Sequence, residues 1–588
     1  MGKTFKHQNE LPSLPIPELN ETKSKLLEWV KPIVSPEQFQ ETSKVVEAFF
    51  KENGEAEKLQ NKLVEWDNQV EGSWLKPFWD NMYLSHRGPV STEINFNVLL
   101  DNKEYKDRYT VAELAGKAAY LTTELYHLII DEEVDPETIK GTPLDMSQYK
   151  NFFKSVRIPR LEKDDYKVGA FDKKNNHVVV LHKKNVYKVN VTDNEGNQYS
   201  SKAIAAAIKT MLSSQDSEGE NIGIFTTAER DKAASIYEQL TASKVNDENL
   251  QIIADSIVVI SIDEESADSK ETVKNLLVNG NNRYYDKGIE IVINKHGEVG
   301  FNIEHTGIDG TTSFAVFNYV NDGLNKDSSE VDHATAHPLV QKLAWEISEE
   351  MKDTLAHLQK ENEESIKDFY LDLRIFDDFG SDQIKKLKIS PDAFFHMALQ
   401  LAQYRTFGAM RSTYEPVAVR FFKDGRTECA RSSSTEKWNM IKAFEDGEDK
   451  ETLYALMQEA GAAHSSRLKE CQKAHGVERH MYGLQQMYAL YGEELGLKEM
   501  PSIFTDKGYQ TLRYDFISTS GMANKNIKYC SFGPVVKDGY GMFYVILNNK
   551  ITINMSSKTK DAENATKLTD NIVAALKELR AVAESSLS

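Results

Sequence analysis

Two runs of alternating apolar and polar residues near the middle of the chain predict a β-hairpin. The segment GIEIVINKHGEVGFNIEHTGIDG, residues 288–310, holds both runs and a Lys-His-Gly turn between them. Successive strand side chains point to opposite faces, so His305 shares the apolar parity of Phe301 and Ile303 and falls where the second strand ends. Both a hydrogen-bonded structural histidine and an active-site base fit this position, and other segments must decide between them.

Apolar periodicity elsewhere predicts helices and strands in alternation. Helical spacing runs through residues 109–130 and 339–358, and a closing helix carries apolar residues at Leu568, Ile572, Leu576 and Leu579. Alternating or β-branched runs predict strands at 177–191, 222–225, 252–262, 369–375 and 551–555. Strands that alternate with helices indicate an α/β layer architecture.

The length of the chain predicts more than one hydrophobic core. A chain of 588 residues is too long for one ordinary hydrophobic core, so we expect two domains, 1–347 and 348–588, divided in the helical segment near Trp345.

Three widely spaced cysteines without a CxxC pair fit a reducing compartment. No apolar run is long enough to span a bilayer, and the opening MGKTFKHQNE lacks the apolar centre of a secretion signal, so we expect a cytoplasmic protein.

The net charge of −20 narrows the classes of ligand. It argues against a broad nucleic-acid or anionic-membrane surface, so a polyanionic ligand would need a local group of Lys or Arg. Lys385, Lys386 and Lys388 form such a group just before a predicted helix that starts at Ser390 and Pro391, where free N–H groups also favour anions. A solvated charge run also explains these lysines, and composition alone favours that explanation.

Three segments downstream carry hydroxyl and charged side chains. Residues 413–434 predict a strand, a turn at Asp424-Gly425 and a second strand. Residues 477–484 are predicted to be helical and carry Arg479, and residues 514–522 end an apolar run in Ser-Thr-Ser-Gly. Hydroxyl groups at the end of a strand are in a position to donate hydrogen bonds into a site.

Nine motifs in order resemble the carnitine/choline O-acyltransferase family, from about Leu11 to Tyr544. They are LPSLPIPEL, WLKPFWDNMYLSHRGP, RIPRLEKD, FNIEHTGIDG, KISPDAFFHMALQLAQYR, TYEPVAVRFFKDGRTECARS, ERHMYGL, STSGM and FGPVVKDGYG. Any one of them could arise by chance. All nine in sequence favour the active-site role of His305 over the structural one.

The resemblance implies a fold and a reaction. The fold would be α/β, with two related domains similar to chloramphenicol acetyltransferase, each built on a mixed β-sheet flanked by helices, and an active-site tunnel at their interface. The reaction would move an acyl group between coenzyme A and the hydroxyl of carnitine or choline. Acyl-CoA would be a substrate, and no permanently bound cofactor and no metal are expected. We also expect a monomer without a nucleic-acid partner.

The resemblance also assigns catalytic roles. His305 would take the proton from the 3-hydroxyl of carnitine, and the resulting oxygen would attack the thioester carbonyl directly, without an acyl-enzyme. A base with a near-neutral pKa and a hydroxyl donor suffice for this chemistry. Ser520 would stabilise the oxyanion. Asp309 would pair with Arg426 and so orient the loop that carries His305.

The acceptor alcohol is predicted from five positions in these motifs. Carnitine has a carboxylate that choline lacks, so a carnitine enzyme needs a cation and hydroxyl donors. Tyr414, Thr427 and Arg479 match the carnitine-type pattern, whereas choline enzymes tend to have Val for the Thr and Asn for the Arg. Ser518 would line the carnitine pocket, and Phe532 would pack near the trimethylammonium group.

Coenzyme A contacts are expected around the predicted helix start. Lys385 and Asp392 match the family pattern, but Ser381 stands where a first lysine is usual. Either the nucleotide contact is weaker, or Lys386 or Lys388 substitutes for the missing lysine.

Cys530 bears on the length of acyl chain that is accepted. It lies two residues before Phe532, where acetyl-selective members carry a bulky Met and others a small residue, so we expect room beyond acetyl, up to medium chains.

The alternative functions are choline O-acetyltransfer, thioesterase-like hydrolysis of acyl-CoA, and a non-catalytic acyl-CoA-binding member of the family. The last would lack the base or the oxyanion hydroxyl, and both His305 and Ser520 are present.

Overall fold

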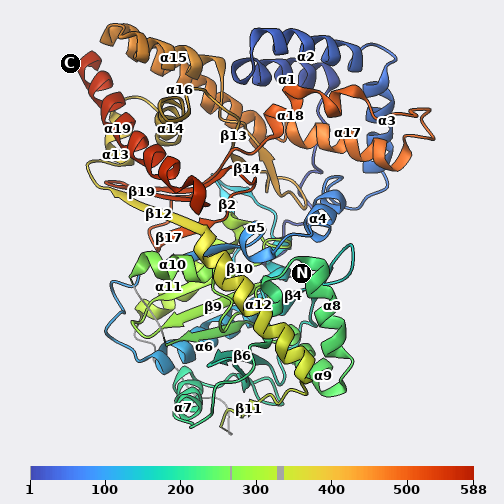
Figure 1. Ribbon diagram of the computed structural model, residues 1–588, viewed down its shortest axis with the longest axis vertical. Coiled ribbons are helices and arrows are strands. Elements are labelled where there is room, and N and C mark those ends of the chain that lie inside the picture. Colours follow the sequence, from blue (N-terminus) through green and yellow to red (C-terminus); the bar gives the residue numbers. More distant parts are fainter. Residues whose placement is uncertain (1, 265–267, 327–336, 588) are drawn as a thin grey trace.

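Two mixed β-sheets form the centre of the molecule, with helices packed around them (Figure 1). The computed structural model describes residues 2–264, 268–326 and 337–587. In spatial order, the first sheet contains β11 (Val340–Lys342), β7 (Asn185–Asn190), β6 (His177–His182), β8 (Val259–Asp263), β9 (Ile289–Asn294), β10 (Val299–Ile303), β1 (Phe96–Leu100) and β17 (Ile527–Phe532). The second contains β12 (Phe369–Phe376), β19 (Ile551–Lys558), β18 (Tyr540–Ile546), β16 (Ile517–Gly521) and β13 (Thr413–Tyr414). Parallel and antiparallel neighbours occur in both sheets, which confirms the expected mixed α/β class.

The predicted hairpin lies within the first sheet. β9 and β10 pair antiparallel, with Ile291 opposite Phe301, and every residue of both strands is buried. A sheet covered on both faces buries both parities. Glu290 and Asn302 are therefore buried as well, and each finds a hydrogen-bond partner inside the protein. The alternation in the sequence therefore predicted the two strands correctly, but neither face of these strands is exposed to solvent.

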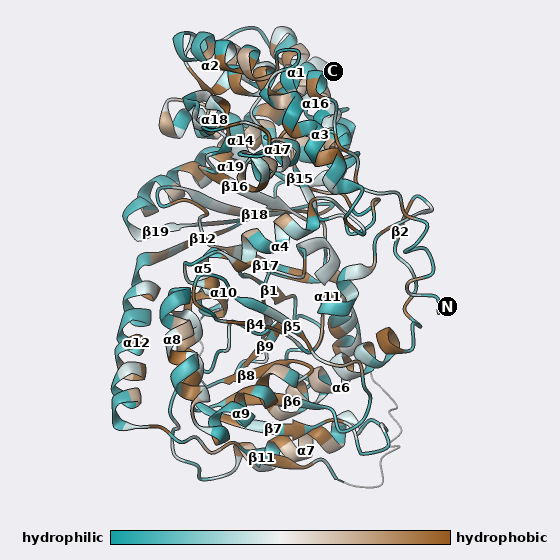
Figure 2. Cartoon of the chain, turned by 90° about the vertical axis from the view of Figure 1, so that its right-hand side faces the viewer, coloured by the Kyte–Doolittle hydropathy of each residue, from teal (hydrophilic) through white to brown (hydrophobic). Residues whose placement is uncertain are grey.

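Helices cover the two faces of the first sheet. One face packs against α6 (Val111–Ile130), α7 (Ser201–Leu212) and α11 (Gly310–Asn325). The other packs against α8 (Arg230–Thr241), α9 (Lys244–Asp255), α12 (Glu349–Asp368) and the 3-10 helix η3 (Ile222–Thr227), while α10 (Ser269–Val278) covers the end near β1 and β17. Figure 2 shows α12 running along the flank of this sheet towards β12.

The second sheet is covered by helices of the C-terminal part of the chain. They are α13 (Ser381–Lys386), α14 (Pro391–Phe407), α15 (Thr435–Asp446), α16 (Lys450–Gln472) and α19 (Ala562–Leu587). α14 begins at Pro391 after Ser390, as predicted, and α19 buries the predicted stripe that includes Leu568 and Leu576. Among the described residues, no helix combines the length and apolarity needed to cross a membrane.

The N-terminal helices pack against the C-terminal half. α1 (Leu19–Val30), α2 (Pro36–Phe49), α3 (Glu55–Asp67) and α4 (Lys76–Leu84) share a hydrophobic core with α17 (Glu478–Tyr491), α18 (Lys507–Arg513) and the hairpin of β14 (Pro416–Ala418) and β15 (Thr427–Cys429). Conversely, β17 of the C-terminal half pairs with β1 and forms the last strand of the first sheet. The chain passes from one sheet to the other through α12, close to the expected division at 347/348. The N-terminal helices and β17 each pack on the other side of that division.

Short elements connect the larger ones. Besides η3, the described residues form the 3-10 helices η1 (Lys31–Ile33), η2 (Ser147–Asn151), η4 (Ser502–Thr505) and η5 (Thr559–Asp561), and the short helix α5 (Val90–Glu93). Two small antiparallel pairs are β2 (Thr138–Ile139) with β3 (Thr142–Pro143), and β4 (Ser155–Ile158) with β5 (Asp165–Val168).

Two strand predictions are wrong in whole or in part. Residues 222–225 form the start of η3, because the Thr226 and Thr227 hydroxyls donate to the carbonyls of Gly223 and Ile224, each at 2.7 Å, and favour a tight helical turn. Residues 252–255 end α9, whose N-cap hydrogen bond to Ser243 starts the helix upstream. A short apolar run cannot by itself distinguish a buried strand from a buried helix.

Candidate active site

The ring of His305 lies just beyond the end of β10, between two aromatic side chains. The ring of Tyr83, on α4, is stacked with it at a centroid distance of 5.5 Å, and the ring of Phe96, on β1, meets it edge-on at 5.0 Å. Phe96 lies opposite Ile303 in the pairing of β1 with β10, so sheet register places it here. The side chain of His305 is 28% exposed, so packing fixes the ring and leaves it accessible.

Two side chains hold the loop that follows His305. Arg426 donates from Nε to Asp309 Oδ2 at 2.8 Å, and its other nitrogens donate to the carbonyl oxygens of Thr306 at 2.7 Å and His305 at 3.2 Å. The predicted ion pair between Asp309 and Arg426 is therefore present. Gln148 donates to the Asp309 carboxylate at 2.7 Å and accepts from the Asp309 backbone N–H at 2.7 Å. No feature of the sequence pointed to Gln148.

Asp309 acts on His305 through charge rather than through a hydrogen bond. Its Oδ1 lies 3.9 Å from Nδ1 of His305, which is too long for a hydrogen bond. Burial lowers the pKa of His305 below its ordinary value of 6.5, and the nearby Asp309 carboxylate opposes that shift. His305 is thus a neutral imidazole at neutral pH, as a general base must be.

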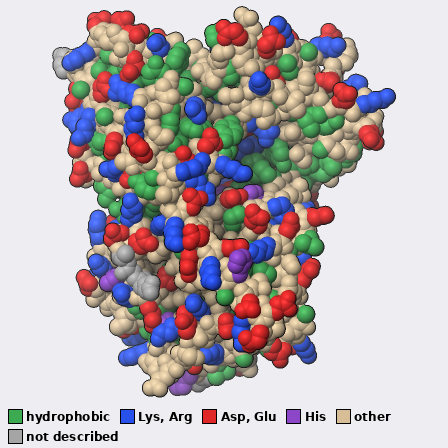
Figure 3. Space-filling model, viewed as in Figure 1, with side chains coloured by type: hydrophobic (Ala, Val, Ile, Leu, Met, Phe, Trp, Pro, Cys, Tyr) green, Lys and Arg blue, Asp and Glu red, His purple; other side chains and the backbone are tan. Residues whose placement is uncertain are grey.

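A cavity of about 480 Å³ lies beside His305, within the size range of small-molecule sites. Figure 3 shows the surface hollowed between the upper and lower halves of the molecule. The predicted residues that line the cavity are His305, Asp309, Tyr414, Thr427, Arg479, Ser518, Ser520, Cys530 and Phe532. The structure therefore brings the predicted base, the predicted oxyanion donor and the predicted acceptor pocket to one place.

The Ser-Thr-Ser segment forms strand β16 at the cavity. Ser518 and Ser520 are two residues apart and so share one face of the strand, whereas Thr519 points the other way and donates to the Tyr414 carbonyl at 2.7 Å. β16 runs parallel to β13, with Ser518 beside Tyr414. The sheet thus aligns the serine hydroxyls with the tyrosine that the sequence assigned to the acceptor pocket.

Arg479 is hydrogen-bonded to the other two residues of the predicted carnitine pattern, Tyr414 and Thr427. Its Nη2 donates to Tyr414 Oη at 2.9 Å and to Thr427 Oγ1 at 3.3 Å, and its Nε donates to the Thr427 carbonyl at 2.8 Å. The nearby acidic side chains are engaged away from this guanidinium: Glu478 pairs with Arg431, and Glu428 accepts from the backbone N–H of Arg479. In the described part of the chain, no carboxylate forms an ion pair with this buried guanidinium.

Trp79 supports Arg479 from α4. The guanidinium carbon lies 4.1 Å from the centre of the Trp79 ring system, a cation–π contact. The sequence predicted only packing for this tryptophan. Trp79 and Tyr83 are four residues apart and therefore lie on one face of the helix. That spacing in WDNMY is the signal that could have placed both in the site.

Two residues of β17 close the other side of the cavity. Phe532 lies opposite Phe96 of β1, and Cys530 lies opposite Val98. Cys530 is buried and contributes to the cavity lining. Their roles with the trimethylammonium group and the acyl chain stay predictions.

The predicted coenzyme A residues lie on a different part of the surface. Lys385 and Lys386 are exposed in the last turn of α13, and Lys388 is exposed in the turn before α14. Ser381 is buried, and its backbone N–H donates to the Leu547 carbonyl at 2.8 Å. Asp392 turns its carboxylate to His464 and Tyr544 rather than to these lysines. The cavity lining does not include these residues, so their role in nucleotide binding stays a prediction.

Comparisons with known proteins cover almost the whole chain. Residues 14–574 match the family described as Choline/Carnitine o-acyltransferase. Carnitine O-acetyltransferase of Rattus norvegicus is 30% identical, covering 99% of this chain and 95% of the relative. Carnitine O-palmitoyltransferase 2, mitochondrial, of Homo sapiens is 30% identical, covering 94% and 89%.

Among solved structures, one match is a mutant of the starter condensation domain of rhizomide synthetase RzmA in complex with C8-CoA and Leu-SNAC. It is 11% identical to this chain with a TM-score of 0.34, and the match covers 88% of this chain and 94% of that chain. Together with a histidine and serine hydroxyls on one cavity, these matches identify the protein as an acyltransferase. The chain belongs to the choline/carnitine O-acyltransferase family.

Proposed function

We propose that the protein transfers acyl groups reversibly between coenzyme A and the 3-hydroxyl of carnitine. One observation carries the choice of acceptor: the guanidinium of Arg479, buried in the wall of the cavity that holds His305, has hydroxyl partners but forms no ion pair with a carboxylate of the described residues. A buried cation without an anion is unfavourable. The carboxylate of carnitine supplies that anion, and choline has none.

The reaction needs a base, an oxyanion donor and a charge that stabilises the protonated base. Neutral His305 accepts the proton of the 3-hydroxyl, and the oxygen attacks the thioester carbonyl. The carbonyl oxygen gains negative charge, and the Ser520 hydroxyl donates a hydrogen bond to it. When the tetrahedral intermediate collapses, the C–S bond breaks, and the thiolate of coenzyme A leaves and accepts the proton that His305 holds. The Asp309 carboxylate stabilises the transient imidazolium, and Arg426 with Gln148 keeps the loop in position.

Nucleotide binding and chain length complete the proposal. Lys385, Lys386 and Lys388 present positive charge at the start of α14, and we assign them to the phosphates of coenzyme A. Cys530 leaves more space at the cavity wall than a methionine would, and we assign medium-chain acyl groups to the protein. Of the two relatives quoted above, one is named for acetyl and the other for palmitoyl groups.

The test is an acceptor comparison. Release of free thiol from acetyl-, octanoyl- and palmitoyl-CoA is measured with carnitine, with choline and with water alone. We expect carnitine to give a rate at least about 100-fold above either alternative, because only carnitine pairs with Arg479. Equal rates with choline would replace the proposal by choline acyltransfer. Equal rates with water would replace it by hydrolysis.

A further inference from the structure

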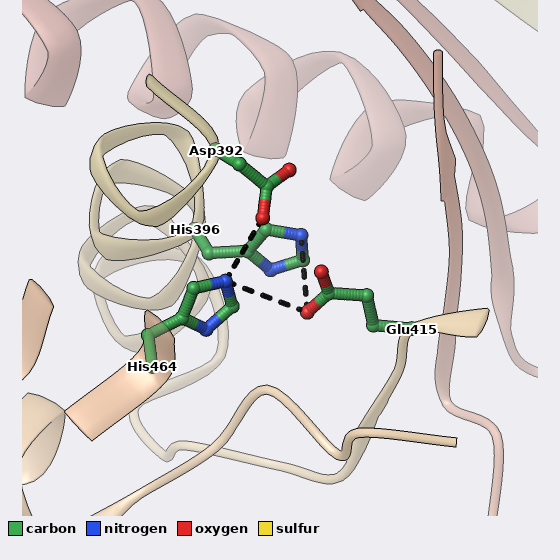
Figure 4. A group of neighbouring side chains, drawn as sticks. All are labelled: Asp392, His396, Glu415 and His464. Carbon is green, nitrogen blue, oxygen red and sulfur yellow. Dashed lines mark hydrogen bonds and ion pairs between the residues drawn. The ribbon is translucent and has the colours of Figure 1, made fainter. Parts of the chain in front are cut away.

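Four buried or half-buried side chains that can bind metals meet beside helix α14 (Figure 4). Asp392 and His396 come from α14 at helical spacing, His464 comes from α16, and Glu415 comes from the segment between β13 and β14. One ligand atom from each lies within 4.8 Å of all the others. The sequence had suggested no metal site, although Asp-x-x-x-His places both side chains on one face of a helix.

The distances within this cluster suit a tetrahedral ion. His464 Nε2 lies 3.0 Å from Asp392 Oδ2 and 3.7 Å from Glu415 Oε2. His396 Nε2 lies 3.5 Å from Glu415 Oε2 and 3.0 Å from Tyr544 Oη, a contact that a bound ion would replace. Zinc bound tetrahedrally at about 2.1 Å separates its ligand atoms by roughly 3.4 Å. Two imidazoles and two carboxylates also balance the charge of a divalent cation.

Glu415 gives an independent indication of a ligand. Its side chain is only 7% exposed, and its Oε2 has no hydrogen-bond partner among the described residues. That oxygen is directed at the Nε2 atoms of the two histidines, which lie beyond normal hydrogen-bond distance from it. A buried carboxylate oxygen without a donor is unfavourable. A cation between the oxygen and the two nitrogens would satisfy it.

In both histidines Nδ1, the ring nitrogen that faces away from the cluster, has a hydrogen-bond partner, as is usual for histidines that bind metals. Nδ1 of His396 lies 2.7 Å from Ser432 Oγ, and Nδ1 of His464 lies 2.8 Å from Lys437 Nζ. Lys437 Nζ also donates to the Ser432 carbonyl at 2.7 Å and to the Ser432 hydroxyl at 3.1 Å.

We propose that Asp392, His396, Glu415 and His464 bind a divalent transition-metal ion of the Zn²⁺ type. The ion would tie α14 and α16 to the segment that carries the acceptor pocket, because Tyr414 and Pro416, on either side of Glu415, both line the cavity. Successive residues of an extended segment point to opposite sides, so Glu415 points away from the reacting groups. The role of the metal is structural support of Tyr414, and it does not depend on the acceptor alcohol.

Metal binding is measured directly, without an activity assay. The full-length protein is stripped with chelator, dialysed against a small excess of Zn²⁺, and analysed for bound metal. Co²⁺ replaces Zn²⁺ in a parallel sample, and its visible spectrum reports the coordination geometry. We expect one metal ion per chain, a tetrahedral Co²⁺ spectrum, and a higher melting temperature with Zn²⁺ than after stripping.

The matched variants are His396→Gln and His464→Gln, with His357→Gln as control. His357 is 68% exposed and pairs with Glu361 at 3.1 Å, so it represents a surface histidine outside the cluster. We expect each cluster variant to weaken Zn²⁺ affinity by more than about 100-fold, as loss of a ligand should, and the control to keep wild-type affinity. Wild-type protein without bound Zn²⁺ overturns the proposal whatever the variants do. Undiminished binding in folded cluster variants overturns it too.

Discussion

Trp79 and Tyr83 lie one turn apart on α4 with their rings edge to face, 6.0 Å between centroids. Trp79 packs under the guanidinium of Arg479, and Tyr83 stacks on the imidazole of His305. One short helix therefore fixes the distance between the group that would hold the carnitine carboxylate and the base that would deprotonate its hydroxyl. Both contacts depend on a helix whose chain position is remote from Arg479.

Replacing Trp79 by Leu should weaken carnitine binding without affecting coenzyme A. The aromatic face contributes about 1–2 kcal/mol to holding a desolvated guanidinium, so the KM for carnitine should rise roughly 5- to 30-fold. Steady-state kinetics with each substrate varied in turn measures this. Trp345→Leu, outside the shared core, is the control and should leave both KM values as they are. A parallel rise in the KM for acyl-CoA would show general damage instead.

Replacing Arg479 by Asn should have a larger effect of the same kind. Loss of a buried charged partner costs about 2–5 kcal/mol, so the KM for carnitine should rise by roughly 30-fold or more while the KM for acyl-CoA changes little. Choline should gain relative to carnitine as acceptor. Equal loss for both substrates would contradict the assignment of Arg479 to the carboxylate.

His305→Ala should remove turnover and leave coenzyme A binding intact. A general base contributes about 100- to 10,000-fold to the rate, and kcat should fall within or beyond that range. Calorimetric titration with coenzyme A checks that the protein still binds nucleotide. His357→Ala serves as the surface control. Near-normal turnover in His305→Ala would rule out the mechanism.

The pH dependence should report the environment of His305. Burial lowers its pKa below 6.5, so kcat/KM should be constant around pH 7–8 and fall only at lower pH, as the imidazole becomes protonated. The Asp309 carboxylate favours the imidazolium and raises that pKa. Asp309→Asn should therefore move the acidic limb to still lower pH, in addition to lowering kcat through the loosened loop. A shift to higher pH would show that Asp309 does not act on His305 through its charge.

Cys530→Met should shorten the preferred acyl chain. A larger side chain in the lining removes space worth about 1–3 kcal/mol per methylene, so the rate ratio of octanoyl-CoA to acetyl-CoA should fall by roughly tenfold or more. Cys530→Ala should leave that ratio equal or raise it. An unchanged ratio in both variants would place the acyl chain elsewhere. Cys429→Ala, a buried cysteine outside the cavity lining, is the matched control.

Local patterns predicted the elements that place the site. The alternation ending at Ile303, the Ser390-Pro391 helix start and the Ser-Thr-Ser strand all appear where expected, because each depends on neighbours in sequence. The convergence of His305, Arg479 and Ser520 on one cavity came only from the resemblance. A pattern among neighbouring residues does not predict which distant segments of the chain will line the same cavity.

Contacts between distant segments explain what the sequence did not reveal. Gln148 binds Asp309 across 161 positions, and Trp79 contacts Arg479 through the fold alone. The four-residue cluster around Glu415 draws on three separate segments. The domain ranges, the cytoplasmic location, the monomeric state and the nucleotide-binding role of Lys385 stay predictions.

The position of β17 has a consequence for how the molecule is made. A ribosome releases β1 early, but β17, which pairs with β1 at the edge of the sheet, emerges only near the end of synthesis. Until then, β1 is an unpaired edge that can stick to other chains. Pairing over so large a sequence separation is also slow. The wall formed by Cys530 and Phe532 is therefore completed late, and a fragment that ends before residue 527 lacks one side of the cavity.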